Sequence, residues 1–252
     1  MDNIETIKIH KYLANLGLGS RRESERWVSE GRVSVNGMTA RVGTRITEMD
    51  TIRVDGRKVG ANQVRHTPKT RVLLYHKQAG EVSARKDNKF PTIFERIPSL
   101  RIGRWINVGR LDLNTSGLIL FTNHGELANR LMHPRNEVER EYAVRVRGTV
   151  SRSTLKRLCR GVVLEDGVAR FKSISEGGRN GTNQWFYVTL CEGKKREVRR
   201  LWESQDVQVS RLIRIRYGSI VLPRQLKAGQ WMELSKIDVQ ELGSSVHLDM
   251  EK

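Results

Sequence analysis

The segment 105–122 reads WINVGRLDLNTSGLILFT, and in it a polar loop separates two apolar runs. The runs Trp105 to Val108 and Leu118 to Thr122 are predicted to be strands. The loop between them, residues 109–117, begins and ends with glycine and carries Asp112 close to Arg110. Loops on a rigid sheet often hold functional side chains, and a carboxylate beside an arginine can be held ionised in a partly buried cleft. Asp112 is therefore a candidate functional residue, with an ordinary surface ion pair as the alternative.

The chain from residue 71 onward adds further strand patterns and a few helical ones. Strands are expected at Val72 to Tyr75, Tyr142 to Val146 and Trp185 to Leu190, and helices at Glu126 to Met132 and Arg196 to Glu203. Runs of strands with few helices between them indicate an α+β fold with a mainly antiparallel sheet. We expect residues 71–252 to form one such domain.

The first sixty residues predict a separate small unit with the order helix, helix, hairpin. Ile7 to Leu16 reads as one helix, and a second helix follows up to Gly31, a natural left-handed stop. Asn36-Gly37 and Asp55-Gly56 favour tight hairpin turns. Residues 60–69 are polar and hold the first proline of the chain, which is typical of a linker. We therefore expect a domain at 1–60 and a linker at 61–70.

The start of the second helix carries a capping pattern and several arginines. The Ser20 hydroxyl can accept a hydrogen bond from an orphan backbone N–H while Glu23 reaches back. Arg21, Arg22 and Arg26 lie at helical spacing beside this helix end, which itself attracts phosphate. We expect these arginines to bind phosphate groups, with a solvated charged face as the alternative.

The charge of the chain favours a polyanionic partner. The 252 residues carry 46 lysines and arginines against 28 acidic residues, a formal net charge of +18. Neutralising phosphates releases condensed counterions, so a surplus of this size favours nucleic acid. A generally basic surface without a partner is the alternative.

Composition argues against several other classes of protein. No apolar run is long enough to span a bilayer, and the first ten residues lack the apolar core of a signal peptide. Cys159 and Cys191 form no CxxC pattern and suit a reduced, cytoplasmic setting. The six histidines show no metal-ligand spacing, so no metal site is expected.

Two groups of motifs resemble known families. Residues 9–37, from Ile9-His10-Lys11 to Val35-Asn36-Gly37, resemble the S-four-type RNA-binding domain, and the helix-helix-hairpin order matches that family. Gly109-Arg110-Leu111-Asp112 followed by Asn114-Thr115-Ser116-Gly117 is similar to the signature of the pseudouridine synthases that pair such a domain with a catalytic one. Further similar stretches are residues 122–134, 138–142, 192–201 and 211–218. The resemblance covers about residues 7–234 and is greatest to bacterial members that act on the large ribosomal subunit.

The resemblance implies an RNA-modifying isomerase that converts uridine to pseudouridine without a cofactor or metal. It implies that Asp112 is the catalytic carboxylate and that Tyr142 stacks on a target base flipped out of its helix. It also implies that Arg199 is the basic partner that holds Asp112 ionised.

The expected substrate-binding residues rest on the resemblance for Leu212, on the position next to Asp112 for Arg110, and on charge for the others. Leu212 would pack under the base pocket, and Arg110 would help to open the target nucleotide from its stack. Lys194 and Lys195 belong to a very basic segment that we expect to grip phosphates. Arg21, Arg22 and Arg26 would bind RNA from the first domain.

One short segment departs from the family pattern. After the strand Val72 to Tyr75 the family usually has Lys-Pro-x-Gly, whereas this chain has Lys77-Gln78-Ala79-Gly80. We expect the change to alter the local turn and to touch no catalytic position.

The expected partner is ribosomal RNA of the large subunit, either as free RNA or in a pre-ribosomal particle. The chain is expected to act in the cytoplasm as a monomer. Two alternatives stay open: the same chemistry on small-subunit RNA, and a non-catalytic RNA-binding factor for ribosome assembly. An inactive descendant would be expected to lose Asp112, Tyr142 or Arg199, and all three are present. The sequence leaves open which uridine is modified and whether Asp112 attacks covalently or abstracts a ribose proton.

Overall fold

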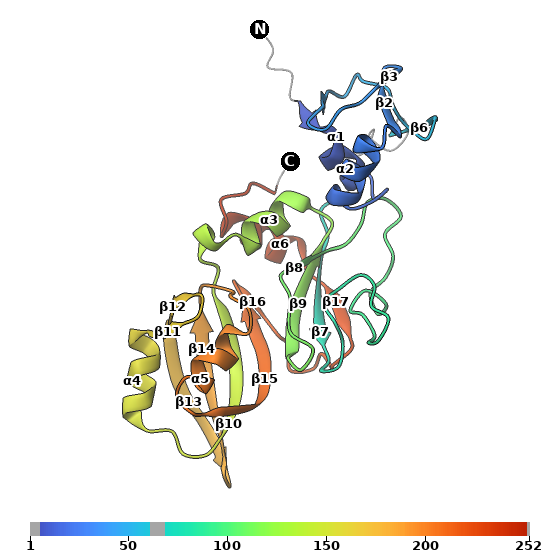
Figure 1. The fold of residues 1–252 in the computed structure, drawn as a ribbon. Helices are drawn as coiled ribbons and strands as arrows, with labels where there is room; N and C mark the ends of the chain where they lie inside the picture. The colour runs from blue at the N-terminus through green and yellow to red at the C-terminus, as the bar shows by residue number, and fades with distance from the viewer. Residues whose placement is uncertain (1–5, 61–68, 251–252) are drawn as a thin grey trace. The chain divides into compact units, whose positions relative to one another are not determined.

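The computed structural model describes residues 6–60 and 69–250, which fall into two compact units (Figure 1). The first unit comprises Met1–Lys69 with Pro98–Trp105, and the second comprises Thr70–Ile97 with Ile106–Lys252. Residues 98–105 were expected from the sequence to belong to the second domain, whereas they pack with the first. Gly103 lies so close to Gly17 that a Cβ atom on Gly17 would clash with the Gly103 carbonyl group. Most of the expected linker, residues 61–68, lies outside the described residues.

The first unit packs two helices against small antiparallel sheets. A four-stranded sheet has the order β3-β2-β5-β6, and β1 pairs with β4. The buried core includes Ile9, Leu13, Val28 and Val33. The elements are β1 (Ile7–Lys8), α1 (Ile9–Asn15), α2 (Arg21–Ser29), β2 (Val33–Val35), β3 (Met38–Thr39), β4 (Arg45–Ile46), β5 (Ile52–Val54) and β6 (Arg57–Val59).

The first helix begins two residues later than the sequence predicted. Ile7 and Lys8 pair with Ile46 and Arg45 as strand β1, and the N–H of Ile9 donates to the carbonyl oxygen of Thr44. The pairing partner lies more than thirty residues away in the sequence (46 − 7 = 39 for Ile7), so helical spacing alone does not reveal it.

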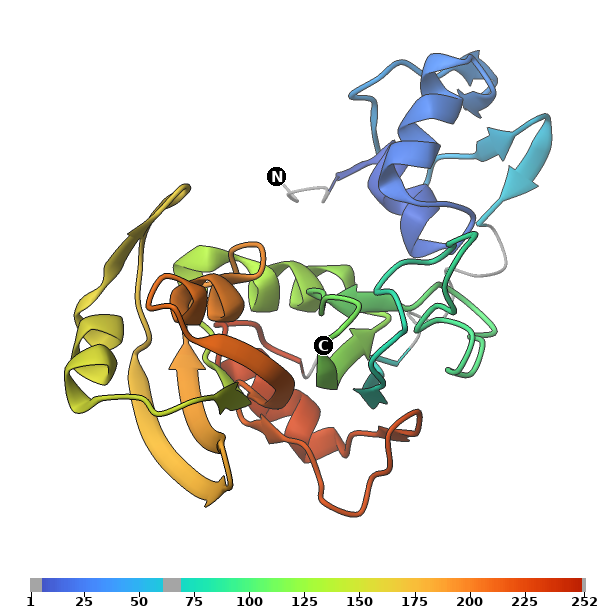
Figure 2. The same cartoon turned by 60° about the horizontal axis from the view of Figure 1, so that its bottom comes forward.

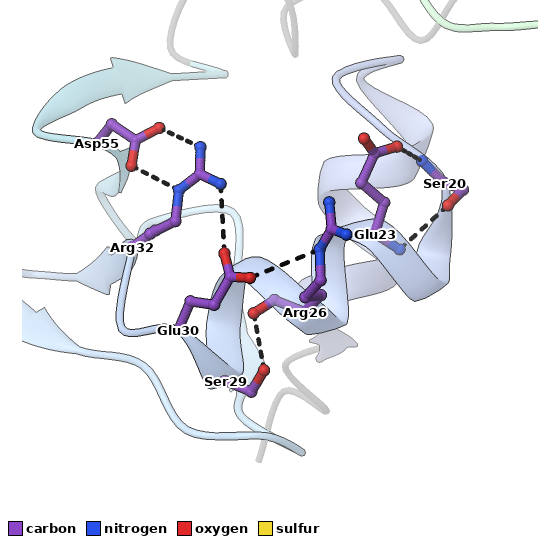
Figure 3. Close-up of polar contacts among 7 residues, drawn as sticks. All are labelled: Ser20, Glu23, Arg26, Ser29, Glu30, Arg32 and Asp55. Carbon is purple, nitrogen blue, oxygen red and sulfur yellow. Dashed lines mark hydrogen bonds and ion pairs between the residues drawn. The ribbon is translucent and has the colours of Figure 1, made fainter.

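The predicted local signals of this unit are confirmed. Ser20 and Glu23 form a reciprocal capping box at the start of α2, with hydrogen bonds of 3.1 and 3.2 Å (Figure 3). Gly31 follows the helix with φ +72°, and Asn36 and Gly37 both have positive φ, as a tight hairpin turn requires.

A chain of ion pairs ties the end of α2 to the β5–β6 turn (Figure 3). Arg26 pairs with Glu30 at 3.6 Å, and Glu30 pairs with Arg32 at 3.3 Å. Arg32 then makes a two-pronged contact with Asp55, with bonds of 2.7 and 2.9 Å. Arg26 is therefore already engaged within the unit.

The second unit is built on one nine-stranded sheet with the order β13-β14-β10-β15-β9-β7-β17, to which β16 and β8 add beside β15 and β9. Every pair in it is antiparallel except β9–β15, so the predicted α+β class with a mainly antiparallel sheet is confirmed. The strands of the unit are β7 (Val72–Lys77), β8 (Ile106–Val108), β9 (Ser116–Thr122), β10 (Arg140–Arg147), β11 (Val162–Leu164), β12 (Gly167–Ala169), β13 (Ser173–Asn180), β14 (Asn183–Leu190), β15 (Gln208–Tyr217), β16 (Ile220–Val221) and β17 (Trp231–Glu233). The helices are α3 (Gly125–Met132), a 3-10 turn η1 (Pro134–Asn136), α4 (Arg152–Arg160), α5 (Glu197–Glu203) and α6 (Lys236–Ser244).

Two hydrophobic cores flank this sheet. One joins β7 and β9 to α3 and α6 through Leu74, Leu120, Leu127 and Leu242. The other lies between the strands β10, β14 and β15 and the helix α5, which crosses in front of them in Figure 1, and it centres on the buried Trp202. None of the described helices is both long and apolar enough to cross a membrane.

The two halves of the sheet meet where β9 and β15 run parallel. Arg214 pairs with Gly117, and Ile213 pairs with Ser116. Gly117 has φ +109°, and a Cβ atom there would clash with the backbone of Arg214. Glycine at this position therefore permits both the backbone conformation and the close approach of the strands.

Candidate active site

Asp112 lies in the loop between β8 and β9, and its neighbours in the loop are held by backbone hydrogen bonds. The N–H of Thr115 donates to the Asp112 carbonyl oxygen at 3.0 Å. The Ser83 hydroxyl donates to the Leu111 carbonyl oxygen at 3.0 Å and accepts from the Leu111 N–H at 3.1 Å. The N–H of Gly80 donates to the carbonyl oxygen of Leu113 at 2.8 Å. Residues on both sides of Asp112 are thus fixed to the segment that follows β7.

This contact corrects one expectation from the sequence. The segment Lys77-Gln78-Ala79-Gly80 was expected to touch no catalytic position, yet Gly80 and Lys77 both bond the loop that carries Asp112. The turn and the loop lie side by side because β7 and β9 pair, with Lys77 opposite Gly117.

Lys77 is a buried cation that the sequence analysis did not include in the site. Its side chain is fully buried, and its ammonium group donates to the carbonyl oxygens of Gln78, Asp112, Leu113 and Thr115 at 2.8, 3.1, 3.4 and 2.8 Å. Burial lowers the pKa of Lys77 to about 8, and the nearby carboxylates of Glu81 and Asp112 oppose that shift. Lys77 thus holds the backbone of the loop that carries Asp112 through hydrogen bonds to its carbonyl oxygens.

Asp112 opens onto a cavity of about 1040 Å³ in the second unit. The half-buried Asp112 carboxylate takes part in no hydrogen bond or ion pair within the described ranges 6–60 and 69–250. The cavity also receives Arg110, Tyr142 and Leu212, so the structure brings these four predicted site residues together. Its cationic lining residues are Arg110, Arg140, Arg170, Lys172, Lys194, Lys195, Arg196 and Arg214, against the carboxylates of Asp112, Glu137, Glu192 and Glu197. The cavity is therefore suited to an anionic ligand.

Tyr142 and Leu212 are placed by adjacent strands of the sheet. Tyr142 on β10 lies opposite Arg214 on β15, and Leu212 lies opposite Val144. Both side chains pack against the core beneath α5 and also line the cavity. They form an apolar and aromatic wall beside Asp112.

Arg199 on α5 lies behind the loop of Asp112. Its guanidinium is buried and donates to the carbonyl oxygens of Val209 and Asn114 at 3.1 and 3.0 Å. No ion pair within 4.0 Å joins it to Asp112 in the described part of the chain. Burial lowers the pKa of Arg199, a neighbouring positive charge on Arg196 lowers it further, and the Asp112 charge raises it. Arg199 thus acts on the loop through its backbone and on Asp112 across space.

Arg214 and Arg140 are further buried cations of the cavity wall that the sequence analysis did not single out. Arg214 donates to the carbonyl oxygen of Leu118 at 2.7 Å and lies 5.1 Å from the ring centre of Tyr217. Arg140 contacts the other edge of the site by donating to the carbonyls of Cys191 and Glu192 at 2.8 and 2.9 Å. Only the position of Arg214 inside a motif similar to the family could have drawn attention to it.

Lys194 and Lys195 lie on the rim of the cavity just before α5. Lys194 donates to the carbonyl oxygen of Val168 at 2.7 Å and pairs with Glu192 at 3.1 Å, whereas Lys195 is exposed. The helix begins one residue later than predicted because Arg196 has φ +52°, in the left-handed region.

The remaining predicted residues belong to the first unit. Arg21 and Arg22 are exposed in the first turn of α2, whereas Arg26 is exposed but pairs with Glu30. For metals, the described residues contain no group of three or more His, Cys, Asp or Glu side chains that could hold an ion.

Comparison with known proteins decides the family. The model of the RNA pseudouridylate synthase family matches residues 71–204, and the S4 domain model matches residues 7–52. The chain belongs to the RNA pseudouridylate synthase family. The expected resemblance is thereby confirmed, and the S4 match falls on the unit with the helix-helix-hairpin order.

Three bacterial relatives of this synthase-family chain are each named ribosomal large subunit pseudouridine synthase B. The protein of Pseudomonas aeruginosa is 51% identical over 96% of this chain and 63% of its own length. Those of Yersinia pestis and Salmonella typhimurium are 53% and 54% identical over 97% of this chain and 77% and 84% of their lengths. The chain therefore spans under two thirds of the first relative.

A solved structure shares the fold of this family member. The crystal structure of a pseudouridylate synthase aligns with a TM-score of 0.64 at 23% sequence identity, over 94% of this chain and 99% of that one. The likeness extends over both units and shows the shared fold.

Proposed function

We propose that this chain converts a uridine of large-subunit ribosomal RNA to pseudouridine, with Asp112 as the catalytic carboxylate. One observation carries the proposal: the Asp112 carboxylate faces a basic cavity with its oxygens unbonded in the described residues, while Lys77 and Arg199 fix the backbone around it. A carboxylate held in this way is oriented yet free to react with a ligand.

The reaction breaks the bond between uracil N1 and ribose C1′ and forms one between uracil C5 and C1′. The proton on C5 leaves and N1 gains one, so there is no net oxidation or reduction and the balance needs no cofactor or metal. In this proposal Asp112 begins the break, either by attack on C1′ or by removing a ribose proton. Both routes need an ionised carboxylate beside the ribose.

The cavity walls supply roles for the other residues. Tyr142 stacks on the extruded uracil and Leu212 packs beneath it, which offsets part of the cost of unstacking the base. Arg110, exposed beside Asp112, helps to hold the nucleotide out of its helix. A volume of about 1040 Å³ lies just above the range of about 300–1,000 Å³ for small-ligand sites, which leaves room for flanking phosphates.

Basic residues away from the base pocket would hold the RNA backbone. Lys194 and Lys195 line the rim of the cavity, and Arg21 and Arg22 lie beside the capped N-terminus of α2. Phosphate contacts of this kind position an RNA without reading its sequence. Arg26 contributes less, because Glu30 already pairs with it.

The large subunit is proposed on the names of the relatives, which are 51–54% identical to this chain. We also propose that the chain works in the cytoplasm as a monomer, on free ribosomal RNA or on a pre-ribosomal particle. A net charge of +18 supports binding to either form of RNA.

The test is to incubate the purified chain with large-subunit RNA, small-subunit RNA and precursor particles, and to map pseudouridines at nucleotide resolution. The expected result is one new pseudouridine in large-subunit RNA. Modification of small-subunit RNA alone would overturn the choice of substrate. Tight RNA binding without any pseudouridine would overturn the proposed enzymatic activity and favour a role as an assembly factor.

A further inference from the structure

The face of the sheet opposite the cavity carries a second group of basic and aromatic side chains. Side chains alternate between the two faces of a strand. On β10, Tyr142, Val144 and Val146 face the core beneath α5, so Arg145 and Arg147 face the other way. On β14, Phe186 and Val188 lie in that core, and Trp185 and Tyr187 point outward.

Strand register brings these outward residues together. Arg145 lies directly opposite Trp185 on one side and Arg211 on the other, and Arg147 follows on the same face. Tyr187 is 41% exposed on the same face of β14. We call the group formed by Arg145, Arg147, Trp185, Tyr187 and Arg211 the basic–aromatic face; its strands lie in the left half of Figure 2.

The arginines of this face keep their charge unneutralised. Arg145 donates to the Ser210 hydroxyl at 3.0 Å and lies 5.9 Å from the ring centre of Trp185, and it faces Arg211 across the strands. Like charges directly opposite each other destabilise a sheet. Within residues 6–60 and 69–250, no carboxylate forms an ion pair with Arg145, Arg147 or Arg211.

Another arginine further along the same strands has carboxylate partners that neutralise its charge. Arg216 on β15 pairs with Glu141 and Glu139 at 2.9 Å each. Arg145 and Arg211 lie opposite each other on the same two strands and have no such partners among the described residues. The arginines without a carboxylate partner among the described residues thus lie at the aromatic end of the face, which favours an anionic ligand there.

A glycine on the neighbouring strand leaves room for the two rings. Gly177 of β13 lies against them, and a Cβ atom there would come 3.0 Å from Trp185 Cβ and 3.2 Å from Tyr187 Cε2. Any larger residue at this position would crowd the rings. β13 is the edge strand of the sheet.

We propose that the basic–aromatic face binds a single-stranded segment of the RNA that flanks the target nucleotide. Bases stack on Trp185 and Tyr187, and phosphates lie on Arg145, Arg147 and Arg211. Unstacked bases and a charged backbone match aromatic rings set among arginines, whereas duplex RNA hides its base faces. The inference rests on the proposed function for the identity of the ligand as RNA.

The test measures binding of a fluorescently labelled single-stranded oligoribonucleotide at several salt concentrations. Arg145→Gln with Arg211→Gln should weaken binding by about tenfold and make the plot of log affinity against log salt shallower by about 1.4, at about 0.7 per phosphate for two phosphates. The matched control is Arg224→Gln with Lys227→Gln, which removes the same charge from exposed residues elsewhere in the unit. It should change both quantities by much less.

Two further variants separate stacking and charge from loss of structure. Tyr187→Leu should weaken binding about tenfold with an unchanged salt slope, because stacking is lost and no charge is removed. Arg145→Lys should keep the slope. The proposal is overturned if the arginine pair behaves like its control, or if Tyr187→Leu binds like the parent chain.

These outcomes are distinct from failure of the proposed function. A parent chain that makes pseudouridine while the face variants match their control would refute the face alone. If the parent chain makes no pseudouridine and the face variants still lose RNA binding, the proposed enzymatic activity is refuted. RNA binding by the basic–aromatic face is then still supported.

Discussion

The guanidinium of Arg199 donates a 3.0 Å hydrogen bond to the backbone carbonyl oxygen of Asn114, two residues beyond Asp112. Its second bond, 3.1 Å to the carbonyl oxygen of Val209, reaches the start of β15. Arg199 thereby couples the loop of Asp112 to the strand that carries Leu212 and Arg214. The residue expected to pair directly with the carboxylate is instead bonded to the backbone that positions it.

Replacing Arg199 should impair chemistry more than binding. Arg199→Ala removes the donor to one buried and one partly buried carbonyl and frees the loop. A displacement of about 1 Å at a reacting group can lower a rate about 100-fold. We expect a single-turnover rate lower by about that factor under saturating RNA, with a modest loss of affinity. Arg200→Ala is the control, because the partly buried Arg200 on the same helix pairs with the exposed Asp166. A normal rate for Arg199→Ala would show that its bond to the Asn114 carbonyl oxygen does not position Asp112 for the reaction.

Lys77 should contribute to stability. Lys77→Met keeps the aliphatic stem but removes the ammonium group that donates to the carbonyls of Asp112 and Thr115 in a buried site. We expect a loss of about 3 kcal/mol in the free energy of unfolding, measured by urea denaturation. Lys227→Met, an exposed lysine of the same unit, should change it by less than about 0.5 kcal/mol.

The same lysine should give a pH dependence of known sign. Its pKa is lowered by burial to about 8 in the folded chain from 10.5, so between these values the unfolded chain binds more protons. Stability contributed by Lys77 therefore rises with pH in that window. The difference in unfolding free energy between the parent and Lys77→Met should grow by about 1 kcal/mol from about pH 8 to about pH 9. A difference that shrinks over this range would contradict the assignment.

Gly117 should resist substitution because of its contact with Arg214. Gly148 offers a matched control, with φ +102° against +109° for Gly117 and nothing within 4 Å of an added Cβ atom. Gly148→Ala should lower stability by about 1–3 kcal/mol through backbone strain alone. Gly117→Ala should lower it further by separating β9 from β15. Equal melting temperatures for the two variants would mean that the close approach is relieved without cost.

Replacing the arginines of the first unit should weaken RNA binding to different extents. Arg21→Gln with Arg22→Gln should weaken binding to many RNAs alike and reduce the salt slope, by about 0.7–0.9 for each phosphate that is no longer neutralised. Arg26→Gln should have less effect, because Glu30 pairs with Arg26 at 3.6 Å. Titration of each variant at several salt concentrations tests this order. A larger loss of affinity for Arg26→Gln than for the pair would reverse it.

Local signals in the sequence predicted local structure well. Ser20 with Glu23, and Asn36 with Gly37, each specify a cap or turn through hydrogen bonds and backbone angles within four residues, and the structure has both. The strand β15 was not predicted as a strand. Charges at Arg211, Arg214 and Arg216 interrupt its apolar pattern, and its parallel partner β9 lies about one hundred residues away (213 − 116 = 97).

In the candidate site, too, residues within recognisable motifs were predicted, whereas a residue positioned by distant contacts was not. Asp112, Tyr142 and Leu212 were found because the motifs around them resemble a family, and the structure places all three at one cavity. Lys77 was missed as a site residue, because a lysine at a strand end reads as a surface charge. Its burial depends on four carbonyl oxygens, three of them from a loop about 35 residues further along the chain.

The central claim is that the Asp112 carboxylate starts the isomerisation. The most direct measurement is the release of tritium from RNA labelled at uridine C5, with Asp112→Asn compared with Asp206→Asn. Asp206 has φ +56°, a conformation that asparagine also adopts readily, so the control changes one exposed carboxylate without strain. We predict that Asp206→Asn releases tritium like the parent, and that Asp112→Asn binds the RNA but releases none above background. Substantial release by Asp112→Asn would contradict the account.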